Sequence, residues 1–115
     1  MRVGKVLAAL FGVGMLITAT PGAASAATGG FSYRYVDTGG SVQRGFLADP
    51  PSAECITLPE VAEPDTTAPA DSPLNFTDAT AVVFTGPDCQ GDYFSLRSVT
   101  GHGSERLKLR SVLFS

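Results

Sequence analysis

Apolar and polar side chains alternate along most of this 115-residue chain after residue 26. In FSYRYV (31–36), Phe31, Tyr33 and Tyr35 share one face of an extended strand. Similar segments separated by Gly- or Pro-containing turns follow at VQRGFLA (42–48), ECITL (54–58), TAVVF (80–84), DYFSLR (92–97) and ERLKLRSVLF (105–114). No window after residue 26 has the apolar spacing of an amphipathic helix. The pattern predicts an all-β fold, a small β-sandwich of short strands.

The first 26 residues predict a signal peptide rather than a part of this fold. Arg2 and Lys5 precede an unbroken apolar run, VLAALFGVGMLIT (6–18), and small residues at 24–26 suit a signal peptidase. The run is short for a membrane-spanning helix. We therefore expect a secreted, extracellular protein, with a retained N-terminal anchor as the alternative.

Cleavage after Ala26 leaves 115 − 26 = 89 residues, enough for one domain, 27–115. Removing Arg2 and Lys5 leaves 8 − 2 = 6 basic side chains against 11 acidic ones, a net charge of −5. Binding to nucleic acid or to an anionic membrane needs clustered Lys and Arg. We expect neither as a partner, and we expect a monomer.

The chain has two cysteines, Cys55 and Cys89, and the exported compartment predicts one disulfide between them. Closing a loop of 89 − 55 = 34 residues stabilises a chain by roughly 3–4 kcal/mol in the chain-entropy description. The alternative, a nucleophilic Cys89, needs a neighbouring base. The single histidine, His102, lies between two glycines with no group to orient it, which favours the structural disulfide.

The two halves of the chain after residue 26 are similar to each other. A shift of 51 residues pairs Tyr33 with Phe84 and Gly40 with Gly91, so that each half has a glycine seven residues after an aromatic residue. Glycine adopts positive φ without steric cost, which suits a sharply folded hairpin. The same shift also pairs Leu58 with Leu109 and Val61 with Val112. The repeat predicts two motifs packed face to face.

This arrangement resembles the Greek-key motif of βγ-crystallin-like domains. The second half fits best, with Phe84, Gly91 and a closing Leu-x-Ser-Val strand that contains Ser111. In that family the closing serine packs over the folded hairpin, and the resemblance implies this role for Ser111. The first half has Glu60 at the corresponding position and fits less well.

The resemblance implies two Greek-key motifs, over residues 30–61 and 79–115. Between them, AEPDTTAPADSPL (62–74) holds three prolines and three acids and predicts an exposed acidic linker. Its functional alternative is a presented loop that enters a partner's cleft. Some secreted bacterial relatives of the family are protease inhibitors, and others resemble killer toxins.

Three basic residues, Arg106, Lys108 and Arg110, are spaced by two and would line one face of a strand. The simplest interpretation is a solvated face that protects a sheet edge. The alternative is a docking stripe for an acidic partner, or for the protein's own acidic linker.

The family's calcium ligands are missing from the second motif. Arg106 and Leu107 stand at its paired acidic positions, and Arg110 stands where a hydroxyl is expected. We therefore expect no metal site of the family's kind. The sequence also has no Ser-His-Asp arrangement, P-loop or dinucleotide-binding fingerprint, so we expect no cofactor and no catalytic residues. Asn75-Phe76-Thr77 is a glycosylation sequon, which matters only in a host that reads it.

These observations favour a secreted, non-enzymatic binding protein, with a protease inhibitor as its most specific form and a secreted protein such as a protease as its partner. A structural or stress-associated extracellular protein is the first alternative. A small antimicrobial protein of the killer-toxin kind is the second, and the net charge of −5 argues mildly against it.

Overall fold

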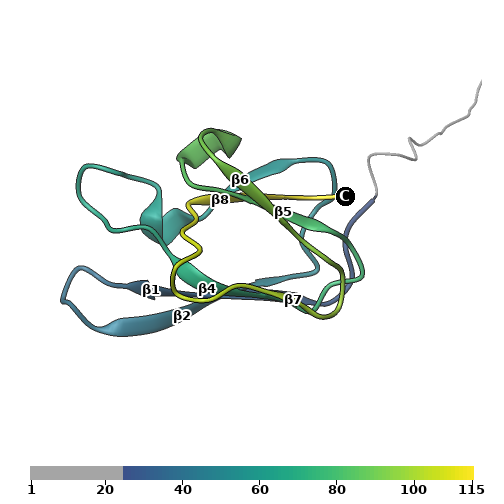
Figure 1. Ribbon diagram of the computed structural model, residues 1–115, viewed down its shortest axis with the longest axis horizontal. Helices are drawn as coiled ribbons and strands as arrows, with labels where there is room; N and C mark the ends of the chain where they lie inside the picture. Colours follow the sequence, from purple (N-terminus) through teal and green to yellow (C-terminus); the bar gives the residue numbers. More distant parts are fainter. Residues whose placement is uncertain (1–24) are drawn as a thin grey trace, which may run out of the picture.

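Two four-stranded antiparallel sheets pack face to face in the computed structural model, which describes residues 25–115 (Figure 1). One sheet has the order β2-β1-β4-β7 and the other β3-β8-β5-β6. The described residues contain no α-helix, so the predicted all-β fold is confirmed. The strands are β1 (Gly30–Val36), β2 (Val42–Ala48), β3 (Cys55–Thr57), β4 (Asp71–Asn75), β5 (Ala81–Phe84), β6 (Tyr93–Leu96), β7 (Gly101–His102) and β8 (Ser111–Phe114).

The first hairpin joins β1 and β2 through a turn that Asp37 organises. Its Oδ1 accepts hydrogen bonds from the backbone N–H groups of Gly39 and Ser41, each at 2.9 Å. Gly40 has φ +86°, a conformation that glycine adopts without strain. The sequence prediction of a special backbone position at this glycine is therefore confirmed.

The second hairpin joins β5 and β6 through a turn that contains a short 3₁₀ helix, η4 (Pro87–Cys89). Gly91 has φ +89°, as the repeat predicted. A Cβ atom at Gly91 would lie 2.4 Å from the Thr85 hydroxyl oxygen, so the close packing of the turn also requires glycine. The matching glycines of the two halves thus serve the same purpose in two related hairpins.

The core lies between the two sheets. The rings of Phe31 and Phe114 meet edge to face with centroids 5.4 Å apart, which joins β1 of one sheet to β8 of the other. Tyr33 is buried too, and its ring lies over Gly45, where a Cβ atom would approach it to 2.2 Å. Burying each such side chain stabilises the fold by about 1.5–3 kcal/mol.

The expectation of an exposed linker over residues 62–74 is wrong for its last five residues, of which Ala70 is buried and pairs with Leu109 in an isolated bridge. Residues 71–74 belong to β4, which lies between β1 and β7, and Asp71 and Pro73 are buried. The pairing with β1 shifts register between Ser32 and Arg34. An irregularity of this kind is where a sheet tolerates a proline.

The internal repeat is therefore imperfect in its later part. The fourth strand of the first half is β4 and begins at Asp71, so the expected correspondence of Leu58 with Leu109 and of Val61 with Val112 does not hold. Thirteen residues, 58–70, separate β3 from β4, whereas eight residues, 103–110, separate β7 from β8. The longer connection in the first half displaced the matching strand from the position that a single shift predicted.

Most of the expected signal peptide, residues 1–26, lies outside the described residues. Ser25 and Ala26 are described, and Ala26 pairs with Pro51 in an isolated antiparallel bridge. Ala27 is buried, and its N–H donates to the Pro50 carbonyl oxygen at 2.8 Å.

Candidate functional site

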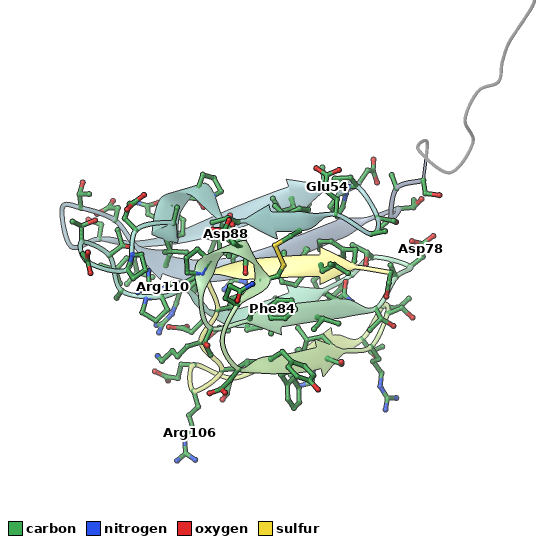
Figure 2. The ribbon with its side chains drawn as sticks, turned by 90° about the horizontal axis from the view of Figure 1, so that it is seen from above. Glu54, Asp78, Phe84, Asp88, Arg106 and Arg110 are labelled. Atoms are coloured by element: carbon green, nitrogen blue, oxygen red, sulfur yellow. A yellow bond between two sulfur atoms is a disulfide. The ribbon has the colours of Figure 1, made fainter. Side chains whose placement is uncertain are left out.

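The disulfide pins the β5–β6 turn to the strand at the opposite edge of the sheet. Cys55 in β3 and Cys89 in the turn are bonded, as the sequence predicted (Figure 2). The Ser111 hydroxyl accepts a hydrogen bond from the Cys89 N–H at 2.9 Å and donates one to the Gly86 carbonyl oxygen at 2.7 Å. Three strands of the sheet therefore hold this turn, because Cys55 is on β3, Ser111 is on β8, and the turn itself continues β5.

Backbone strain accompanies this attachment. Asp88 and Cys89 both have φ +57°, a left-handed conformation that is unfavourable for residues other than glycine. Thr57 offsets part of this cost, because its hydroxyl accepts a hydrogen bond from the Asp88 N–H at 2.9 Å. Phe84, the aromatic residue of the second motif, packs its ring on Tyr93 across the same hairpin, with ring centroids 6.2 Å apart.

The three basic residues of the expected stripe do not share one face. The chain is not a strand over residues 103–110, and β8 begins only at Ser111. Arg106 is exposed and points away from the body of the protein, whereas only 8% of Arg110 is exposed (Figure 2). Lys108 lies 3.6 Å from the Asp71 carboxylate. The alternative of a continuous docking stripe over these residues is therefore wrong.

Arg110 instead holds the connection between β3 and β4. Its Nη1 donates to the Val61 carbonyl oxygen at 2.9 Å and to the Thr67 hydroxyl at 3.1 Å. Its Nη2 donates to the Thr67 carbonyl oxygen at 2.7 Å. Contacts between basic residues and the expected linker are thus present at two of the three positions, because Arg110 bonds neutral oxygens of Thr67 and Lys108 lies near the Asp71 carboxylate.

We call residues 62–69 the anchored loop. It follows a 3₁₀ turn, η3 (Pro59–Val61), in which Val61 is buried. The Glu63 carbonyl oxygen accepts hydrogen bonds from the N–H groups of Thr66 at 3.2 Å and Thr67 at 3.0 Å. Glu63, Pro64 and Asp65 are exposed. The loop therefore presents two carboxylates and a proline at its tip, while Thr67 near its base is half-buried and bonded to Arg110.

An open pocket of about 170 Å³ lies between the anchored loop and the β1–β2 turn. Its lining includes Asp37, Glu60 and Thr67. The Glu60 carboxylate accepts a hydrogen bond from the Tyr33 hydroxyl at 2.7 Å. Burial of Tyr33, and to a smaller extent this hydrogen bond, raises the pKa of Tyr33. Hydrogen bonds from Ser41, Gln43 and the turn hold the pKa of Asp37 below its usual value. This end of the protein is acidic.

Asp71 forms a second polar centre behind the loop. It accepts two hydrogen bonds from the Arg34 guanidinium, at 2.8 and 2.9 Å, and one from the Ser72 hydroxyl at 2.7 Å. Burial acts to raise the pKa of Asp71, but the hydrogen bonds from Arg34 and Ser72 and the charges of Arg34 and Lys108 outweigh it, so the pKa is lowered. Glu105 lies 3.8 Å from the same arginine. These contacts fix the start of β4.

Asn75 and Thr77 form a buried network that the sequence did not reveal. Both residues are fully buried. The Asn75 Nδ2 lies within hydrogen-bond distance of three carbonyl oxygens, those of Ala79, Leu96 and Arg97, at 2.8, 3.3 and 3.0 Å. Its Oδ1 accepts from the Thr77 hydroxyl at 2.7 Å. The sequon that these residues form was the one sequence feature that drew attention to them. In the folded protein their side chains join β4 to the β6–β7 turn.

Within residues 25–115, no three His, Cys, Asp or Glu side chains gather as a group that could hold a metal ion. The same residues include no helix long and apolar enough to cross a membrane. No family model matches the chain, and no curated protein or solved structure is significantly similar to it.

Proposed function

We propose that this protein is a secreted, non-enzymatic binding protein that presents the anchored loop to another extracellular protein, most specifically as a protease inhibitor. The observation that carries the proposal is the attachment of the loop by Arg110. Three hydrogen bonds from one buried guanidinium hold Val61 and Thr67 at the base, while Glu63 and Asp65 remain exposed.

A loop held in this way loses little conformational entropy when it enters a cleft. Ordering a flexible, rotamer-rich side chain costs about 0.5–1.5 kcal/mol on binding, and prior ordering removes part of that cost. Pro64 restricts the backbone of the tip, and Pro69 that of the base. The two carboxylates at the tip favour a partner whose cleft is lined with basic side chains.

The scaffold proposed for this loop is a pair of Greek-key motifs like those of βγ-crystallin-like domains. In a Greek key the fourth strand returns to lie beside the first, and here β4 pairs with β1 while β8 pairs with β5. Each third strand joins the sheet of the other half, since β3 pairs with β8 and β7 pairs with β4. The contacts of Ser111 with the folded β5–β6 turn agree with the role that the resemblance implies.

The test is a titration of the purified, disulfide-bonded protein against a panel of secreted serine and metalloproteases. The proposal expects a stoichiometric, saturable loss of one protease's activity. Reversing the loop charge with Glu63→Lys and Asp65→Lys should then weaken inhibition by about ten-fold or more. Glu54→Lys is the matched control, because Glu54 is exposed and lies far from this loop (Figure 2).

A structural extracellular role is the second candidate, and the attachment of the β5–β6 turn by the disulfide and by Ser111 favours it. The disulfide and the buried Asn75–Thr77 network both add stability without creating a binding surface. Absence of inhibition at large molar excess over every protease in the panel would favour this role over the inhibitor.

A further inference from the structure

A second surface lies where β6 and β7 form neighbouring edges of the two sheets. An open pocket of about 440 Å³ is lined there by Phe94, Ser95, Leu96, Arg97, Thr100, Gly101 and His102. β6 is the last strand of the upper sheet and β7 the last strand of the lower one (Figure 1). The pocket is therefore the mouth between the sheets, and we call it the edge pocket.

The edge pocket differs in charge from the rest of the protein. Its lining includes Arg97 and His102 and no acidic residue, although the chain as a whole is acidic. Arg97 is exposed, and its guanidinium has no carboxylate within salt-bridge distance among residues 25–115. The His102 Nδ1 lies 3.1 Å from the Thr100 carbonyl oxygen, which occupies that ring nitrogen and leaves Nε2 for another partner. The pocket therefore complements an anionic group.

β6 also has an open hydrogen-bonding edge. The Thr85 N–H donates to the Asp92 carbonyl oxygen at 2.9 Å, so Thr85 and Asp92 form a hydrogen-bonded pair. Pairs alternate along an antiparallel ladder, so the backbone groups of Tyr93 and Ser95 point away from β5. Among the described strands, none pairs with that side of β6. Such an edge accepts an added strand.

Hydrogen bonds to neighbouring segments hold the β6–β7 turn that borders the pocket. Val99 has φ +68°, which is strained for a β-branched residue, and the Thr100 N–H closes a three-residue turn onto the Ser98 carbonyl oxygen at 2.7 Å. The Val99 N–H donates to the Thr77 carbonyl oxygen at 2.8 Å, and Asn75 bonds the Arg97 carbonyl oxygen. Strain of this kind persists where surrounding contacts enforce it, and it is concentrated at binding sites.

We propose that the edge pocket binds an extended peptide segment that carries a carboxylate and pairs as an added strand with β6. Backbone hydrogen bonds to Ser95 would align the segment, the exposed ring of Phe94 would contact its apolar side chains, and Arg97 would bind the carboxylate. The chain's own residues 1–24 contain no Asp or Glu, so they do not supply this ligand. This surface is separate from the anchored loop and does not depend on the function proposed for it.

The experiment titrates the purified, disulfide-bonded protein with acetylated pentapeptides and follows backbone amide shifts by NMR. Val-Thr-Val-Asp-Val amide carries an internal carboxylate, and Val-Thr-Val-Thr-Val acid carries a terminal one. Val-Thr-Val-Thr-Val amide is the neutral control. One or both of the acidic peptides should bind about ten-fold more tightly than the neutral peptide, with shifts centred on Ser95 and Arg97. The stronger of the two identifies whether the carboxylate comes from a side chain or a chain end.

Variants separate this site from general charge attraction. Arg97→Glu should weaken binding about ten-fold or more, whereas Arg106→Glu, which makes the same charge change outside the pocket, should change it less than about two-fold. Ser95→Pro removes an edge donor and should abolish binding, whereas Ser95→Ala should retain it. Because Ser95→Pro could unfold the protein, a backbone N-methylated peptide tests the same pairing on the unchanged chain and should not bind.

Three results would each overturn the proposal. The first is equal affinity for acidic and neutral peptides, and the second is an equal loss of affinity in Arg97→Glu and Arg106→Glu. The third is undiminished binding of the N-methylated peptide. Failure of protease inhibition leaves this proposal intact, since that assay tests residues 62–69 at another surface.

Discussion

Replacing Arg110 with methionine should loosen the anchored loop and destabilise the whole fold. The Val61 carbonyl oxygen would lose its guanidinium donor, and Val61 is fully buried. A buried acceptor without a donor costs about 1–3 kcal/mol. The two bonds to Thr67 are less costly to lose, since Thr67 is only half-buried and water can replace the donor.

The guanidinium is itself a buried charge, and its removal recovers part of the cost of desolvating it. The methionine side chain keeps the apolar stem packed. We therefore expect a net loss of about 2 kcal/mol in the free energy of unfolding, which for a domain of this size lowers the melting temperature by about 8–16 °C. The same 2 kcal/mol corresponds to roughly a thirty-fold greater population of the opened state.

Chemical denaturation measures the first quantity, and limited proteolysis within residues 62–69 measures the second under conditions where cleavage follows the opened population. Arg106→Met is the matched control, because Arg106 is exposed and its side chain makes no hydrogen bond to the described residues. Equal melting temperatures and equal cleavage rates for the two variants would refute the anchoring role of Arg110.

Three further perturbations test other parts of the structure. Reduction of Cys55–Cys89 should lower the free energy of unfolding by about 3–4 kcal/mol, the chain-entropy value for a loop of this length. A chelator should leave the melting temperature unchanged. A melting temperature that responds to the chelator and not to the reductant would contradict this prediction. Asp71 has a lowered pKa in the folded protein, so its contribution to stability is present above the unfolded value of about 3.9 and is lost as the pH falls through the folded value. The unfolding free energy of Asp71→Asn should therefore change less between about pH 5 and about pH 3 than that of the unchanged protein. Asp65→Asn is the exposed control. An equal pH dependence of the unfolding free energy in Asp71→Asn and in the unchanged protein would count against the Arg34 pairing. Gly40→Ala should lower the free energy of unfolding by about 1 kcal/mol because of its positive φ alone. Gly91→Ala should lower it more, because the new Cβ would also meet Thr85. A larger loss for Gly40→Ala than for Gly91→Ala in urea unfolding would contradict this account.

The hairpins were predictable from the sequence because their determinants are local. Alternating side chains predict β1, β2, β5 and β6, and the period of two assigns Phe31 and Tyr33 to the buried face. The conformations of Gly40 and Gly91 follow from their places in tight turns. The disulfide followed from cysteine number and expected export.

The fourth strand of the first half could not be predicted in this way. Asp71, Ser72 and Pro73 have the composition of a linker, and only the pairing of β4 with β1 and β7 makes them part of a sheet. The register shift admits the proline, and Arg34 neutralises the buried Asp71. These compensating partners lie far away in the sequence, so no local pattern contains them.

The surface shows the same division, because its composition is set by the sequence whereas the position of each charged side chain depends on contacts between distant segments. The sequence determined the net charge, the supply of basic residues and the acidic composition of residues 62–74. The tertiary structure decided that Arg110 is buried and Arg106 exposed, because Arg110 directly precedes β8 and bonds the connection between β3 and β4, whereas Arg106 lies in the turn before it. It also brought Arg97, which directly follows β6 of one sheet, and His102, which lies in β7 of the other, to one pocket. Which side chains meet depends on strand order, and strand order is set by the packing of the whole core.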